Sequence, residues 1–177
     1  MNKTEPTQKK RSAKTYLEIG AGEKAAVHLM PKLRRGDKYV AIDVSRLALR
    51  NRERVKVTGV QNLYMSANAF SIPLRDNSVD YVVTRNMVSA PHFPHHYASS
   101  FREAIEKLEA ELVRVTKKGG SMTFHEHYTP EVLDLPIEKS RRRHILDVFS
   151  RRWIIRRDDF RELPGERKGA VIKLFKK

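Results

Sequence analysis

The sequence contains no cysteine, and this absence excludes several kinds of chemistry at once. Disulfide bonds, thiolate metal sites and a catalytic thiol all require cysteine, so none of them contributes here. The sequence also has no run of about 18 apolar residues, the length that a membrane-spanning helix needs. Its first 14 residues lack the apolar segment of a secretory signal. We therefore expect a cytoplasmic protein without a membrane partner.

Length and composition predict one folded domain. The chain has 177 residues, of which 40% are hydrophobic and 32% charged, a balance typical of globular proteins. The hydrophobic patterning begins after a short basic stretch. We predict a flexible basic tail over residues 1–13 and a single domain over residues 14–177.

Positive charge is concentrated at the two ends of the chain. The net charge is +15, with +4 in residues 1–14 and +9 in residues 139–177. This asymmetry favours an anionic partner, first of all RNA, because clustered Lys and Arg attract phosphate. The alternative is a basic surface, or a solvated helix face, without a dedicated ligand. Five arginines are the candidate nucleic-acid contacts, since a guanidinium pairs with two phosphate oxygens: Arg141, Arg142, Arg143, Arg151 and Arg152.

Apolar segments of strand length alternate with segments of helical periodicity. This alternation predicts an α/β, Rossmann-like fold with a seven-stranded, mostly parallel sheet and helices on both faces. The last two strands are joined by a short connection, which a parallel crossover does not allow, so one strand near the C-terminus is antiparallel. Strands are expected at 15–19, 39–42, 62–65, 79–83, 121–124, 153–156 and 170–175, and helices at 23–33, 46–54, 99–115 and 136–149.

A glycine-containing turn follows the first expected strand. Gly20 and Gly22 let the backbone approach a ligand closely, and the helix expected next directs its N-terminal amides to the same place. Asp43 ends the second strand, where a carboxylate can accept both hydroxyls of a ribose. Its alternative role is the N-cap of the following helix. Asn68, after the third strand, is suited to an adenine edge or, alternatively, to a turn.

Taken together, these segments resemble the class I methyltransferase family that uses S-adenosylmethionine (SAM), close to its small type 11 branch. The resemblance covers about residues 15–127. Each segment alone is a weak signal, and their order along the chain makes the match specific. A nicotinamide dehydrogenase is the competing interpretation of the turn alone. The matching segments are LEIGAG at 17–22, AIDVS at 41–45, 68–69 with 72–74, 76–80, 84–88, 111–115 and 118–120.

The resemblance implies a cofactor site along the carboxyl ends of these strands. Glu18 would orient the methionine part of SAM, Asp43 would hold the ribose and Asn68 would face the adenine. Arg85 and Asn86 would lie near the methyl group. The family often has a third glycine where this chain has a lysine, and an aspartate where it has Asn68. The complete set of expected cofactor residues is Glu18, Gly20, Ala21, Gly22, Asp43, Val44, Asn68, Ala69, Arg85 and Asn86.

Candidate catalytic groups occur at the ends of the fourth and fifth strands. His92, His125 and Glu126 are the expected acid–base residues, because histidine exchanges protons near neutral pH and both segments reach the ligand edge of such a sheet. The alternatives are ordinary loop histidines or an imidazole–carboxylate metal site. We expect no metal.

The methyl acceptor is expected to be RNA or a ribonucleoprotein. Residues 85–88 read Arg-Asn-Met-Val, which disfavours the DNA base methyltransferases that carry an Asn/Asp-Pro-Pro-aromatic run. The charge asymmetry then favours RNA. The small domain suggests that a protein or ribosomal partner completes the substrate site. Two alternatives stay open: an O- or N-methyltransferase of small molecules, and a catalytically weak methyltransferase-like protein that binds RNA or the ribosome.

Overall fold

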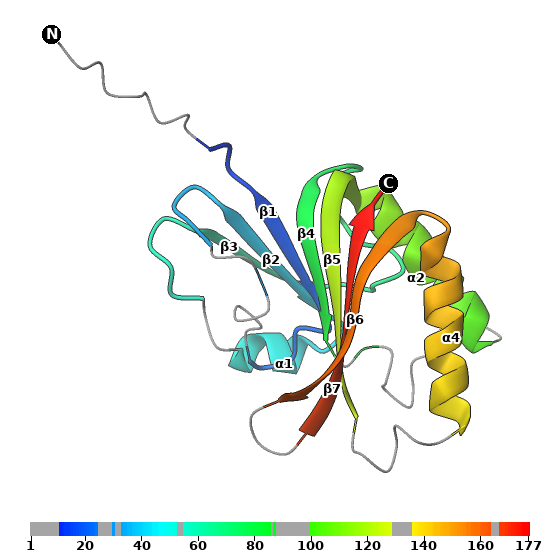
Figure 1. The fold of residues 1–177 in the computed structure, drawn as a ribbon. Coiled ribbons are helices and arrows are strands. Elements are labelled where there is room, and N and C mark those ends of the chain that lie inside the picture. The colour runs from blue at the N-terminus through cyan, green and yellow to red at the C-terminus, as the bar shows by residue number, and fades with distance from the viewer. Residues whose placement is uncertain are drawn as a thin grey trace, which may run out of the picture.

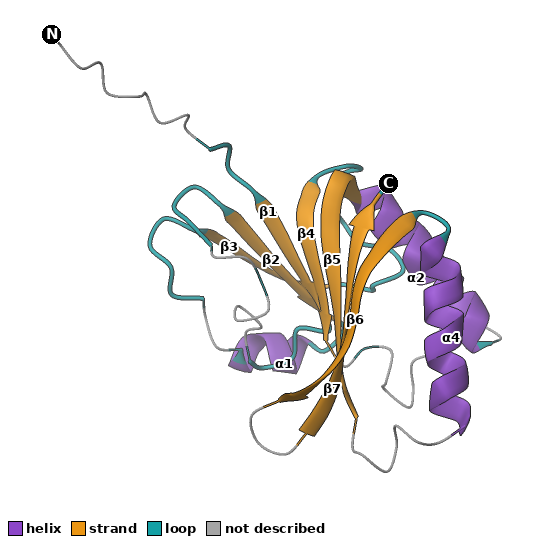
Figure 2. Cartoon of the chain, in the orientation of Figure 1, coloured by secondary structure: helices purple, strands orange, loops and turns teal. Residues whose placement is uncertain are grey.

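Seven strands and three helices make up the described part of the computed structural model (Figures 1 and 2). The structure describes residues 11–24, 30, 33–52, 55–85, 87, 100–128, 136–163 and 167–177. The expected tail and the helix expected at 23–33 therefore lie largely outside the described residues. The elements are β1 (Thr15–Ile19), β2 (Lys38–Asp43), α1 (Arg46–Asn51), β3 (Gln61–Ser66), β4 (Val79–Arg85), α2 (Phe101–Val115), β5 (Thr116–Tyr128), α4 (Pro136–Ser150), β6 (Trp153–Leu163) and β7 (Arg167–Lys176).

The strands form one sheet in the order β3-β2-β1-β4-β5-β7-β6. The first five strands in this order pair in parallel, whereas β7 runs antiparallel to both β5 and β6. A short link between β6 and β7 permits only this antiparallel arrangement. The predicted mostly parallel sheet with one antiparallel strand near the C-terminus is confirmed.

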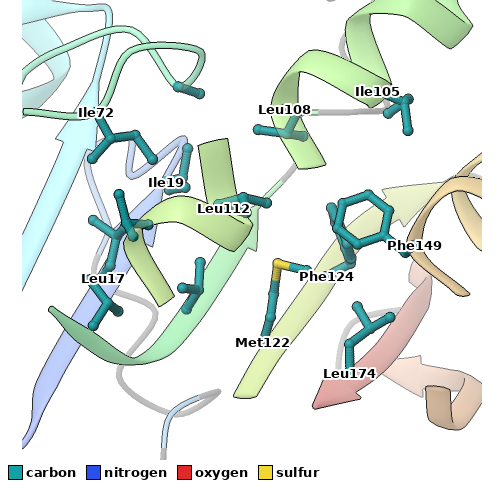
Figure 3. Close-up of a cluster of buried hydrophobic side chains, with 14 of the residues drawn as sticks. Leu17, Ile19, Ile72, Ile105, Leu108, Leu112, Met122, Phe124, Phe149 and Leu174 are labelled. Carbon is teal, nitrogen blue, oxygen red and sulfur yellow. The ribbon is translucent and has the colours of Figure 1, made fainter. Parts of the chain in front are cut away.

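Helices cover both faces of the sheet because alternate strand residues point to opposite sides. Leu17 and Ile19 of β1 join the core beneath α2 and α4, where the rings of Phe124 and Phe149 meet edge-on with centroids 4.9 Å apart (Figure 3). Tyr16, on the opposite face of β1, belongs to a second core cluster, which includes one residue of α1. None of the helices in the described ranges combines the length and apolarity needed to cross a membrane.

Strand β5 is longer than the strand expected at 121–124. Helix α2 ends at Val115 as expected, where the N–H of Thr116 bonds to Leu112 O, so Gly119 and Gly120 do not terminate it. The two glycines lie inside β5 instead. Gly119 has φ +73°, and the pairing with β4 shifts register beside these residues. They therefore form an irregular entry into the strand rather than the helix cap.

Strands β5, β7 and β6 continue past the ends of their neighbours (Figure 1). The last pair between β4 and β5 is Arg85 with His125, yet β5 pairs with β7 as far as Tyr128. The expected strands at 153–156 and 170–175 were correspondingly too short. Charged residues interrupt the apolar pattern here, but strand pairing uses backbone groups that every residue except proline supplies.

Helix α1 ends earlier than expected. Ser45 is its N-cap, since its side chain accepts the N–H of Ala48, so the alternative N-cap role of Asp43 is not the one observed. The predicted helix ran to residue 54, but α1 stops at Asn51 because Arg52 takes an extended conformation with φ −62° and ψ 133°. This early end turns the chain back toward the sheet and determines where the side chain of Arg52 lies.

Candidate cofactor site

The turn after β1 depends on two glycines in the left-handed region. Gly20 has φ +68°, and a Cβ added there would lie 2.6 Å from the carbonyl oxygen of Arg85. Gly22 has φ +54°, with nothing within 4 Å of an added Cβ. Glycine adopts such angles without the strain that a side chain brings. The turn is therefore packed against the end of β4 on one side and open at Gly22.

Asp43 joins the end of β2 to this turn. One carboxylate oxygen accepts the N–H of Gly22 at 2.9 Å, and the other accepts the N–H of Ser45 at 2.8 Å. The N–H of Ala21 also bonds to Ile42 O at 3.2 Å. Since a carboxylate has about four lone-pair sites, Asp43 retains acceptor capacity for a ligand hydroxyl.

Glu18 is fully buried and ion-paired. Its side chain and that of Arg52 are both 0% exposed, with Glu18 Oε2 at 2.6 Å from Arg52 Nη2. Tyr39 donates its hydroxyl to the same carboxylate oxygen and accepts from Arg52 Nη2 at 2.6 Å. Burial, reinforced by the carboxylate, raises the pKa of Tyr39 well above its usual value. Arg52 and Tyr39 therefore engage Oε2 of Glu18 inside the protein, and its role in orienting SAM stays a prediction.

Two arginines bind the backbone of the turn and of the residues after it. Arg52 Nη1 donates to the carbonyl oxygens of Ala21, Gly22 and Lys24, the last two at 2.9 and 3.1 Å. Arg85 Nη1 also donates to Lys24 O, at 2.8 Å, and lies 3.9 Å from Glu18 Oε1. Arg85 thus lies beside the turn, and its expected position near the methyl group of SAM stays a prediction. Sequence reasoning missed Arg52, because a charged residue in a polar stretch gives no signal of burial.

The expected adenine side of the site lies after β2 and β3. Asn68 Oδ1 accepts the N–H of Phe70 at 2.9 Å, which is the turn role that was weighed against an adenine contact. Ala69 is buried. Val44 and Leu47 are exposed, at 61% and 66%, an unusual position for large apolar side chains. Leu47 was not among the expected residues, since its helical spacing gave no reason to single it out.

The expected catalytic residues are only partly described. His125 is 2% exposed in β5 and is the register partner of Arg85. Its burial makes it neither a loop histidine nor a base open to solvent, so its catalytic role stays a prediction. Glu126 is the next residue of β5. His92 and Asn86 lie outside the described residues, and within the described ranges no three His, Asp or Glu side chains gather as metal ligands.

The five expected nucleic-acid arginines lie in α4 and just after it. Arg143 is exposed, and the guanidinium of Arg141 lies 5.2 Å from the ring centroid of Phe101. Arg151 contacts Asp147 at 3.4 Å, so part of its charge is offset. Arg152 forms an ion pair with a buried glutamate of α2, which offsets part of its charge as well. The side chain of Arg142 lies outside the described ones.

At 1.5 Å per helical residue, Arg141 lies about 14 Å along α4 from the end of the helix at Ser150, and Arg151 and Arg152 follow that end. Strand β6 begins directly after Arg152, where Trp153 pairs with Lys176. This end of the strands is opposite the end that carries the glycine turn. A ligand that touched Arg141 and Arg152 would have to extend along α4. The structure therefore does not gather the five arginines into one compact pocket.

Comparison with known proteins agrees with this arrangement. The model of the family described as Methyltransferase domain matches residues 17–124. No curated protein matches the sequence. Among solved structures, a SAM-dependent methyltransferase from Methanosarcina mazei has a TM-score of 0.65 at 18% identity, covering 94% of this chain and 93% of that one.

Two further solved structures share the fold. A SAM-dependent methyltransferase from Aquifex aeolicus has a TM-score of 0.59 at 20% identity, over 90% of this chain and 81% of its own. Geranyl diphosphate C-methyltransferase from Streptomyces coelicolor has a TM-score of 0.60 at 11% identity, over 93% and 74%. The last was crystallised with S-adenosyl-L-homocysteine.

Proposed function

The chain belongs to the methyltransferase domain family, and on that premise we propose that it transfers the methyl group of SAM to RNA or to a ribonucleoprotein. Family membership bears out the sequence-based expectation of a SAM-dependent enzyme. The acceptor is the part of the proposal that requires a test. The observation that supports RNA as the acceptor is the net charge of +9 in residues 139–177.

The residues at the carboxyl edge fit SAM. Gly22 borders open space, so a ligand can approach the backbone of the turn. Asp43 stands beside the turn with acceptor capacity for ribose hydroxyls. The exposed apolar side chains of Val44 and Leu47 follow directly and offer contact area to an adenine ring. SAM supplies the electrophilic methyl group, and the protein aligns the acceptor with it.

The charged surface supports an extended polyanion as acceptor. Arg143 is exposed and forms no ion pair within the described part of the chain. Arg151 is about half exposed despite its contact with Asp147. Because the basic residues are spread along α4 instead of meeting in one pocket, a chain of phosphates matches them better than a single phosphate does.

Small-molecule methylation is the second candidate. Geranyl diphosphate, the substrate named for the Streptomyces coelicolor enzyme, is anionic, so positive charge also suits an acceptor of that kind. A catalytically weak RNA- or ribosome-binding protein is the third. A protein or ribosomal partner that completes the acceptor site is compatible with an RNA methyltransferase and with an RNA- or ribosome-binding protein.

The test is transfer of labelled methyl from SAM to cellular RNA, ribosomal subunits and a panel of small anionic acceptors. We expect label in the RNA or ribosomal fraction. Label only in small molecules would establish the second candidate. RNA binding without transfer would leave the third.

Two matched variants test the basic surface. Arg143→Gln removes a charge from α4, whereas Arg75→Gln removes one from an exposed loop before β4. For a single-stranded RNA, loss of one phosphate contact lowers the salt slope of log K by about 0.7. We expect this change for Arg143→Gln only. Equal effects of both variants would indicate nonspecific attraction to net charge.

A further inference from the structure

Beneath the glycine turn lies a buried guanidinium that the family motifs do not include. We propose that Arg52 is a positioning residue, which fixes the peptide planes of the turn in the orientation that receives SAM. This inference rests on the proposed use of SAM and is independent of the acceptor. It concerns Arg52, whose side chain is 0% exposed and lies under the backbone rather than in contact with the ligand space.

The peptide unit between Ala21 and Gly22 is held from both sides. Its carbonyl oxygen accepts from Arg52 Nη1, and its N–H donates to Asp43 at 2.9 Å. In a planar trans peptide the C=O and N–H point in opposite directions. Arg52 and Asp43 therefore fix the rotation of one peptide plane between them, and the loss of either leaves it held from one side only.

The next peptide unit is held in the same sense. Gly22 O accepts from Arg52 Nη1 at 2.9 Å, so the N–H of Glu23 in that unit points away from the guanidinium. Lys24 O accepts from the same nitrogen at 3.1 Å and from Arg85 at 2.8 Å. Arg52 thus binds three of the four carbonyl groups between Ala21 and Lys24, and the N–H groups of the first two of these peptide units point away from it.

The ion pair with Glu18 allows a guanidinium to occupy this position. A lone positive charge would be costly to bury and would repel the sulfonium of SAM. Glu18 Oε2, at 2.6 Å from Nη2, offsets that charge, and Tyr39 uses a further donor. Burial alone would lower the pKa of Arg52, but Glu18 and Tyr39 more than offset this, so the pKa stays above its usual value. Arg52 remains charged.

Arg52→Lys and Tyr39→Phe separate positioning from general support of the core. Lysine keeps the charge beside Glu18, but its single nitrogen cannot serve that carboxylate and three carbonyls together. Phenylalanine removes a buried hydroxyl from the same cluster and leaves the carbonyl contacts of Arg52 in place. Thermal unfolding of both variants measures how far each one weakens the fold.

Two readouts apply to each variant: calorimetric SAM affinity, and hydrogen exchange of the Gly22 amide measured without SAM. For Arg52→Lys we expect affinity about tenfold or more weaker and faster Gly22 exchange. For Tyr39→Phe we expect affinity within about twofold of wild type and unchanged Gly22 exchange. Wild-type behaviour of Arg52→Lys, or losses in both variants that simply follow their unfolding temperatures, would overturn the inference.

The exchange measurement separates this inference from the proposed function. Failure of the wild type to bind SAM contradicts the proposed function, whereas unchanged Gly22 exchange in Arg52→Lys contradicts the positioning role. If Arg52→Lys does not fold, the double variant Glu18→Gln/Arg52→Gln takes its place, because it removes both buried charges at once. The same loss of affinity and the same faster exchange are expected of it.

Discussion

The carboxylate of Asp43 accepts the backbone N–H of Gly22 at 2.9 Å, which links the end of β2 to the turn that follows β1. The second oxygen of Asp43 holds the N–H of Ser45, at the start of α1. Asp43, which we expect to bind a ribose, therefore also stabilises the turn of the same site. Changes at Asp43 will alter both the ligand contacts and the turn.

Asp43→Ala is expected to weaken SAM binding by about 10- to 100-fold, because it removes charge-assisted hydrogen bonds worth roughly 1.5–3 kcal/mol each. Asp43→Asn keeps one carbonyl acceptor and should lose less. Calorimetric titration measures both. Asp147→Ala, which removes an exposed aspartate of α4, is the control and should leave the affinity unchanged. Wild-type affinity of Asp43→Ala would exclude Asp43 from the cofactor site.

Gly22→Ala and Gly36→Ala form a matched pair. Both glycines have positive φ, +54° and +89°, and neither has an atom within 4 Å of an added Cβ. Each substitution should therefore cost about 1–2 kcal/mol of stability from backbone strain. Only the methyl group at residue 22 enters the space above the turn, so only Gly22→Ala should weaken SAM binding beyond its effect on unfolding. Equal affinities of the two variants would contradict the assigned site.

Asp37 should contribute to acid unfolding. Burial opposes its charge, but the N–H groups of Lys14 and Arg34 and the guanidinium of Arg11 more than compensate and hold its pKa below the ordinary 3.8. A lowered pKa in the folded state gives stability that is present above about pH 4 and is lost as pH falls through the folded pKa. Asp37→Asn should be less stable at neutral pH by about 1–3 kcal/mol and lose less on acidification. Urea titrations that give wild type and Asp37→Asn the same loss of unfolding free energy on acidification would contradict this.

Glu109 should show the opposite pH dependence. Burial raises its pKa above 4.5 despite the nearby charge of Arg152 and the Nε1–H of Trp153, which donates at 3.1 Å. Between the ordinary and the raised pKa the folded state holds an extra proton, so stability falls as pH rises through that window. Glu109→Gln keeps an acceptor for Trp153 and should gain stability relative to wild type over the same window. The exposed Glu106→Gln, one turn away, should follow wild type at every pH.

The fold was predictable because its strands are short apolar segments whose order is distinctive. The buried runs of β1, β2 and β4 and the two helix N-caps Ser45 and Ser100 all carry local signals. Strand pairing through backbone groups leaves no such local signal in the sequence. The charged ends of β6 and β7 were therefore missed, and so was the start of β5, which contains Gly119 at positive φ.

The cofactor site was predictable at the turn and at Asp43, where backbone geometry demands particular residue types. It was not predictable beneath the turn. Motif position gives Glu18 a role toward the ligand, but it does not show which other side chains contact Glu18. Arg52 lies 34 positions from Glu18, and no local pattern indicates that its guanidinium folds back beneath β1.

Because Arg52 directly follows α1, the number of residues in this segment matters more than their identity. Each residue of an α-helix turns the chain by about 100°. One insertion or deletion between Ser45 and Arg52 would rotate the guanidinium away from the carbonyl groups it serves. The exposed residues of α1 other than Leu47 can be exchanged freely by comparison. This segment should accept many substitutions and very few changes in the number of residues.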